Sequence, residues 1–137
     1  MGQQQLLLII LGVIIVGIAV AVGITMFQDN AVDQNRSAVI ADLTTLAAKA
    51  QQYYAKPTTL GGGASSFVGL TKDATGLAVL ASTAFTTNAN GTYSIGTAGS
   101  STYVIIHGVG ATALSDGTFP SYDMSVTSQK QFPTKVN

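Results

Sequence analysis

An uninterrupted apolar run near the N-terminus constrains this chain more than any other feature. From Leu6 to Phe27 the 22 residues are Leu, Ile, Val, Ala, Gly, Met and Phe with a single Thr, and no charged side chain precedes Asp29. About 20 helical residues, rising about 1.5 Å each, cross the roughly 30 Å apolar layer of a bilayer. A cleaved secretory signal has a basic start, a shorter apolar core and a small-residue cleavage site. The run therefore predicts a membrane helix that stays on the working protein.

The segment after this run is polar but carries one apolar stripe. Between Gln28 and Ala55, apolar side chains recur at helical spacing, with members at Val32, Val39, Leu43, Leu46, Ala50 and Tyr53. No stop signal occurs before Lys56-Pro57, so the pattern predicts one helix from about Gln3 to Ala55, roughly 80 Å long. We expect the stripe to pack on a sheet and to form the helix side of the core through Val39, Leu43, Leu46 and Tyr53.

The remaining residues predict a small antiparallel sheet. Turn signals at Asn90-Gly91 and Asp116-Gly117 separate stretches that alternate or run apolar like strands. The expected elements are a short strand at Phe67 to Leu70, a short helix within Asp73 to Phe85, and strands at Tyr93 to Thr97, Thr102 to Val109 and Tyr122 to Ser128. The tail from Gln129 to Asn137, which contains Pro133, is either an edge strand or a covering segment.

Together these elements predict an α+β fold: a long N-terminal helix over about residues 1–55, with a three- to four-stranded antiparallel sheet packed on its second half. We expect three regions. Residues 1–27 are the apolar helix, residues 28–56 are its amphipathic continuation, and residues 57–137 are a small β-rich domain.

Composition restricts the classes of function. Six Lys and Arg residues balance six Asp residues, Glu is absent, and charged residues make up only 9% of the chain. This balance excludes the basic surface typical of nucleic-acid binding, and a net charge near zero favours association. The chain also has no Cys, so the small domain cannot rely on disulfides and needs packing on the long helix or in an assembly.

Catalysis and metal binding find little support. The only His is His107, and its strand neighbours Ile105, Ile106 and Val109 offer no chemical partner. The six Asp residues lack the spacing of a calcium loop. With no Cys and no Glu, the sequence predicts neither an enzyme nor a cofactor or metal site.

The order of these segments resembles that of type IV pilins and the related pseudopilins. A short polar start, Met1-Gly2-Gln3-Gln4-Gln5, precedes the apolar run, and the amphipathic continuation ends in Tyr53-Tyr54 before a loop and a small sheet. The resemblance covers the first 55 residues and extends to the rest only in architecture. It implies a precursor in the inner membrane that a prepilin peptidase trims after a Gly. Pilus assembly machinery then packs the mature chains helix to helix into an extracellular homopolymer.

The resemblance implies a set of processing and assembly residues. Cleavage after Gly2 would make Gln3 the mature start, whereas an already mature chain would start at Met1. The assembly contacts are expected at Gln3, Gln4, Gln5, Leu6, Leu7, Ile10, Gly17, Gly23 and Phe27.

The chain departs from the family at one position that matters for assembly. Many members carry a Glu four residues after the mature start, and here that place is held by Gln5 or Leu7, depending on the start. A buried amide needs only hydrogen-bond partners, whereas a buried carboxylate needs a counter-charge. We expect Gln3, Gln4 and Gln5 to set the register between neighbouring helices through amide contacts.

The sequence thus predicts a structural subunit of a type IV pilus-like filament, first in the inner membrane and then at the cell surface. Two alternatives stay open. One is a single-pass membrane protein that carries a small binding domain outside the cytoplasm, and the other is a pseudopilin of a secretion system.

Overall fold

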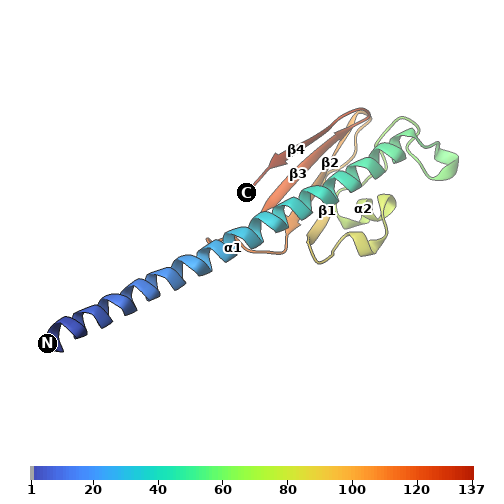
Figure 1. Ribbon diagram of the computed structural model, residues 1–137. Coiled ribbons are helices and arrows are strands. Elements are labelled where there is room, and N and C mark those ends of the chain that lie inside the picture. Colours follow the sequence, from blue (N-terminus) through green and yellow to red (C-terminus); the bar gives the residue numbers. More distant parts are fainter. Residues whose placement is uncertain (1) are drawn as a thin grey trace.

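One long helix supports the entire fold. The computed structural model describes residues 2–137, and helix α1 runs without a break from Gly2 to Ala55. Figure 1 shows that the first half of α1 projects alone, while the rest of the chain gathers against its second half. The remaining elements are η1 (Thr58–Leu60), α2 (Ala74–Leu80), η2 (Thr83–Phe85), β1 (Gly91–Thr97), β2 (Tyr103–Gly110), β3 (Ser121–Thr127) and β4 (Gln131–Lys135). The predicted α+β architecture is confirmed, and the helix ends at Ala55 as expected.

The four strands form one antiparallel sheet in the order β1-β2-β3-β4. Each strand pairs with the next one along the chain, and Ile106 of β2 lies opposite Ile95 of β1 and Met124 of β3. Because side chains alternate between the two faces of a strand, these three residues share the face that covers α1. All three are buried, whereas the opposite face of the sheet is only partly covered.

The core lies between this face and the second half of α1. Val39, Leu43 and Leu46 are fully buried, and Tyr53 packs partly buried at the end of the core. The close approach of helix and sheet depends on Gly108, where a Cβ would lie 3.2 Å from Cδ1 of Leu43 and 3.0 Å from the Tyr93 ring. The core also includes Phe67, Leu70, Leu77, Tyr93, Ile95, Val104, Ile106, Met124 and Val126.

The strand expected at Phe67 to Leu70 is wrong. These residues form a turn in which the Leu70 amide donates to the Phe67 carbonyl at 3.1 Å, and Gly69 has a φ of +111°. Phe67 and Leu70 are apolar because they plug the end of the core, where the Phe67 ring packs 4.8 Å from that of Tyr54. Buried apolar residues close together in sequence therefore marked a turn and not a strand.

The region Asp73 to Phe85 contains the expected short helix, but it is split. Helix α2 ends at Leu80 because Ala81 is extended, with φ −141° and ψ 161°, and η2 follows separately. The C-terminal tail resolves the alternative left by its sequence, since Gln131–Lys135 forms the edge strand β4.

Candidate functional site

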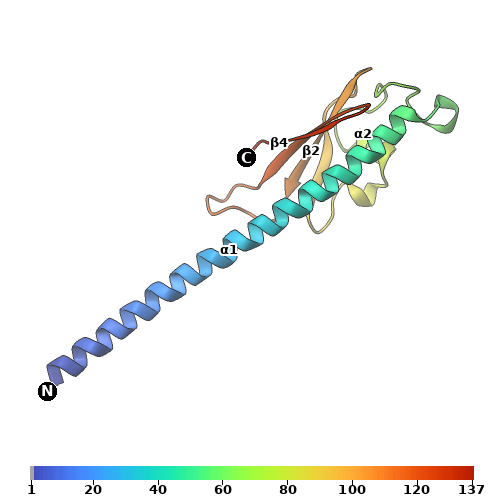
Figure 2. The same cartoon turned by 45° about the horizontal axis from the view of Figure 1, so that its top comes forward.

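The projecting half of α1 is an apolar surface with no cover from the rest of the molecule. Every large apolar side chain from Leu6 to Phe27 is exposed. Figure 2 shows that the N-terminal half of the helix projects away from the other elements. Monomeric soluble proteins rarely expose contiguous apolar patches of more than a few hundred Å². Larger exposed apolar surfaces are typical of sites that contact a membrane or another protein. By length and composition α1 is a candidate membrane span.

The residues expected to make assembly contacts all lie on this bare helix. Leu6, Leu7, Ile10 and Phe27 are exposed, with Phe27 the most exposed at 79%. Gly17 and Gly23 have open space around them, since a Cβ at either position would meet nothing within 4 Å. Whether these residues contact other chains stays a prediction.

The polar side chains at the start of α1 are also exposed. Gln3, Gln4 and Gln5 are exposed on the first turns of α1 and make no side-chain hydrogen bond within residues 2–137. Their amides are available to another molecule, as the expected register contacts require. Gly2 begins α1, and the expected cleavage after it stays a prediction. Met1, the other expected start, lies outside the described residues.

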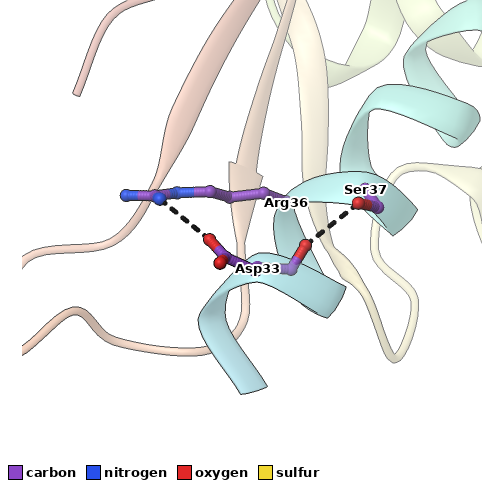
Figure 3. A network of polar contacts seen from close by, with 3 residues as sticks. All are labelled: Asp33, Arg36 and Ser37. Atoms are coloured by element: carbon purple, nitrogen blue, oxygen red, sulfur yellow. Dashed lines mark hydrogen bonds and ion pairs between the residues drawn. The ribbon is translucent and has the colours of Figure 1, made fainter. Parts of the chain in front are cut away.

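A polar junction follows where the bare helix meets the domain. Nη1 of Arg36 donates to Oδ1 of Asp33 at 3.1 Å, and the Ser37 hydroxyl donates to the Asp33 backbone carbonyl at 3.0 Å (Figure 3). Both bonds join residues that are three or four positions apart on α1. The ion pair is exposed at Asp33 and so contributes at most about 1 kcal/mol to stability.

A groove lies at this junction between α1 and the loop that joins β2 to β3. Figure 2 shows this loop extending along α1 toward its projecting half. The groove has a volume of about 340 Å³ and is lined by Asp29, Val32, Asp33, Arg36, Leu114 and Ser115. We call it the junction groove. A second groove of about 330 Å³ lies along the same loop, beside Gln28 and Ala31 of α1. Leu114 is part of the lining of both grooves.

Asn35 of α1 anchors the end of the sheet at which β1 begins and β2 ends. Although polar, it is only 9% exposed, and its Nδ2 donates to the Asn90 carbonyl at 2.7 Å. Its Oδ1 accepts from the Thr112 amide at 3.3 Å. These two partners flank the first pair of β1 and β2, so one side chain fixes both strands. Gly110 makes room for it, because a Cβ there would lie 2.2 Å from Asn35 Oδ1.

Asp42 forms a second anchor, about two helical turns further into the domain. Its Oδ2 accepts hydrogen bonds from Asn88 at 2.9 Å, Asn90 at 2.9 Å and the Tyr93 hydroxyl at 2.7 Å. Burial acts to raise the pKa of Asp42, but the bonds from Asn90, Asn88 and Tyr93 outweigh it and hold the pKa below its ordinary value. Burial, together with the bond to Asp42, raises the pKa of Tyr93 well above its ordinary range. These anchors hold the domain at a fixed place on α1.

The inference that His107 lacks a chemical partner is wrong. Its Nδ1 lies 2.5 Å from Oδ1 of Asp123, which is directly opposite on β3. The sequence neighbours of His107 gave no sign of this pair, because it depends on the register between two strands. Ser94 and Thr134 continue the same row across the outer face. Within the described residues no group of three His, Cys, Asp or Glu side chains is placed to hold a metal ion.

Comparisons of the chain with protein-family models, with curated proteins and with solved structures find no match.

Proposed function

We propose that this chain is the structural subunit of an extracellular type IV pilus-like filament that assembles by helix-to-helix packing of residues 1–27. The observation that carries the proposal is the continuity of α1. The same helix that is bare from Leu6 to Phe27 enters the core at Val32, with neither Pro nor Gly between Phe27 and Val32. A plain membrane anchor needs no rigid connection to its domain, whereas a filament subunit must transmit position from its core helix to its outer domain.

The energetics of burial favour a stable assembly. Burying a side chain such as Leu6 or Ile10 contributes about 1.5–3 kcal/mol. About five such contacts match the roughly 5–15 kcal/mol that stabilise a typical domain. The exposed apolar surface of α1 offers more than five such side chains. A filament built in this way would not dissociate without a machine that returns subunits to the membrane.

In this proposal the chain begins in the inner membrane, with the apolar half of α1 across the bilayer. Processing after Gly2 and transfer by pilus assembly machinery then bring the same surface against other copies of the chain. The membrane and the filament core are both apolar, so one helix surface serves both stages. Gln3, Gln4 and Gln5 supply amide contacts at the start of the helix, in the absence of a carboxylate.

The deciding experiment is electron microscopy of material sheared from cells that produce the chain. We expect thin filaments that contain the chain, and intact-mass analysis of these filaments should show loss of Met1-Gly2 or methylation of the first residue. A chain found only as a monomer in the membrane would instead support a single-pass anchored domain. Short, scarce periplasmic assemblies would support a pseudopilin.

A substitution at Gly17 tests the helix surface itself. A Cβ at position 17 meets nothing within 4 Å, and leucine favours helix more than glycine does, so we expect the Gly17→Leu monomer to remain folded while close helix approach is blocked. We expect filament yield to fall at least about tenfold, which corresponds to 1.4 kcal/mol per subunit contact. Gln34→Leu is the matched control, because it adds the same side chain to an exposed position beyond the apolar run. Equal yields for both variants would contradict helix packing at Gly17.

A further inference from the structure

Two grooves beside α1 carry opposite charge. In the junction groove, the carboxylates of Asp29 and Asp33 outnumber the one guanidinium of Arg36. A second groove, of about 130 Å³, lies nearer the C-terminal end of α1. Its lining includes Lys49, Lys56, Val79 and Leu80 and contains no acidic side chain. We call it the lysine groove. The same chain therefore presents an excess of negative charge in one groove and of positive charge in the other.

The chain does not pair these charges internally. Within residues 2–137, none of Asp29, Lys49 and Lys56 forms an ion pair. The Lys49 ammonium lies over the Phe85 ring, 5.5 Å from its centre, and Asp29 and Lys56 are exposed. The unpaired groups are thus open to contact from another molecule.

The two grooves open on opposite flanks of α1. Gln51 follows Asp33 by about five full helical turns, so both lie on the same flank. The Gln131 side chain of β4 donates to Oε1 of Gln51 at 3.2 Å, which places the junction groove on the β4 side. The lysine groove is bounded by Val79 of α2. Figure 1 shows α2 and β4 on opposite sides of α1.

The axial spacing of the charges matches between the grooves. At about 1.5 Å per residue, Lys49 stands about 30 Å beyond Asp29 along α1, and Lys56 about 35 Å beyond Asp33. The two distances differ by about 5 Å, which flexible lysine side chains can absorb. When two parallel copies lie flank to flank, one displacement of about 30–35 Å therefore brings both carboxylates to both ammonium groups.

We propose that the junction groove of one copy docks on the lysine groove of a second copy, with Asp29 against Lys49 and Asp33 against Lys56. The inference rests on the proposed filament and adds a contact between domains to the packing of the helices. Leu114 beside the acidic groups and Val79 beside the lysines give the contact an apolar part.

This contact supplies two properties that the bare helix lacks. Apolar packing along residues 6–27 is non-directional, whereas complementary charges fix the axial position of one copy on the next. The two grooves are also different surfaces, so the contact is heterologous. A heterologous contact repeats from copy to copy and produces an open helical polymer when the rotation does not close a ring.

Carbodiimide cross-linking of purified filaments, followed by digestion and mass spectrometry, tests the contact directly. The reagent joins a carboxylate to an amine that touches it. Asp29 and Lys49 are about 30 Å apart on one rigid helix, so a cross-link between them must join two copies. We expect peptides that link Asp29 to Lys49 or Asp33 to Lys56. Filaments in which neither pair is linked would overturn the proposal.

Charge reversal gives a second readout. Asp29→Lys and Lys49→Asp should each lower filament yield about tenfold because like charges then meet, and the double variant should recover to within about threefold of the parent. Lys130→Glu is the matched control, since Lys130 is exposed on the turn between β3 and β4 and does not line the lysine groove. Its yield should stay within about twofold of the parent.

The results separate this contact from the proposed function. Parental yields for both single reversals, or a folded double variant no better than either of them, would refute the docking of the two grooves. If Lys49→Asp does not fold by circular dichroism, the cross-links of the parent chain decide. A parent chain that never forms filaments would refute the proposed function itself.

Discussion

Tyr93→Phe tests the anchor that fixes the domain on α1. The Tyr93 ring is fully buried, and its hydroxyl donates to Oδ2 of Asp42 at 2.7 Å. Phenylalanine keeps the ring and its packing but removes this one donor. Asp42 retains the two amide donors of Asn88 and Asn90, so the carboxylate does not become unpaired.

The expected loss follows from the type of bond. A hydrogen bond to a charged group contributes about 1.5–3 kcal/mol, and the two remaining donors place Tyr93→Phe near the lower end, at about 1.5 kcal/mol. For a domain of this size about 1 kcal/mol shifts the melting temperature by about 4–8 °C. We therefore expect the variant to melt about 6–12 °C below the parent chain at neutral pH.

The loss of stability in Tyr93→Phe should depend on pH in both the acid and the alkaline range. Asp42 has a folded-state pKa below its ordinary value of 3.8, so it contributes stability above that value and loses it as the pH falls through the folded-state pKa. Tyr93 has a raised pKa, so its contribution is complete below its ordinary value of 10.0 and is lost as the pH rises toward the folded-state pKa. The difference between parent and variant should be largest between these limits and should shrink outside them.

The assay is thermal unfolding of the full chain in detergent micelles, followed by circular dichroism at several pH values. Tyr103→Phe is the matched control, because Tyr103 is 40% exposed and its hydroxyl makes no hydrogen bond within the described residues. Its effect should stay within about 0.5 kcal/mol. A Tyr93→Phe chain as stable as Tyr103→Phe, or a penalty that does not change at acid pH, would refute the reasoning.

Three further predictions concern the stability of the fold and the aggregation of the sheet edge. Leu43→Ala should cost about 2–5 kcal/mol because Leu43 is fully buried, whereas Thr44→Ala on the exposed side should stay within about 0.5 kcal/mol. Gly110→Ala should cost about 1–3 kcal/mol, since its Cβ would overlap Asn35; wild-type stability would show that Asn35 is free to move. Pro133→Val restores an N–H on the edge strand β4 and should increase thioflavin-positive aggregates, and unchanged aggregation would show that Pro133 does not protect that edge.

The helix and the sheet were predictable because their signals are local. No Pro interrupts the chain before Pro57, and the stripe through Val39 and Leu46 has the period of one helix, so α1 was expected almost to the residue. Asn90-Gly91 marked the start of β1 for a similar reason. The predicted strand at Phe67 was wrong because an apolar, buried segment can be either a strand or a turn that fills the end of the core.

The anchors were not predictable because they join distant residues. Asp42 stands beside the apolar stripe in the sequence, where a carboxylate normally faces water, and its three donors follow more than 40 residues later. The only local hint was the pair Asn88 and Asn90 next to a turn. His107 and Asp123 likewise meet only through the register of β2 and β3.

The edges of the sheet strengthen the argument for assembly through α1. Along β1 the outer edge is already occupied, because Ile95 exchanges hydrogen bonds with Asp73 and the Tyr93 amide donates to Thr86. On β4, Thr127 and Val136 fix the alternation of bonds to β3, so the backbone at position 133 faces the open edge. Proline there has no N–H to offer a further strand. Lateral addition of strands is thus hindered at both edges, which agrees with the proposal that copies of this chain pack through the bare apolar half of α1.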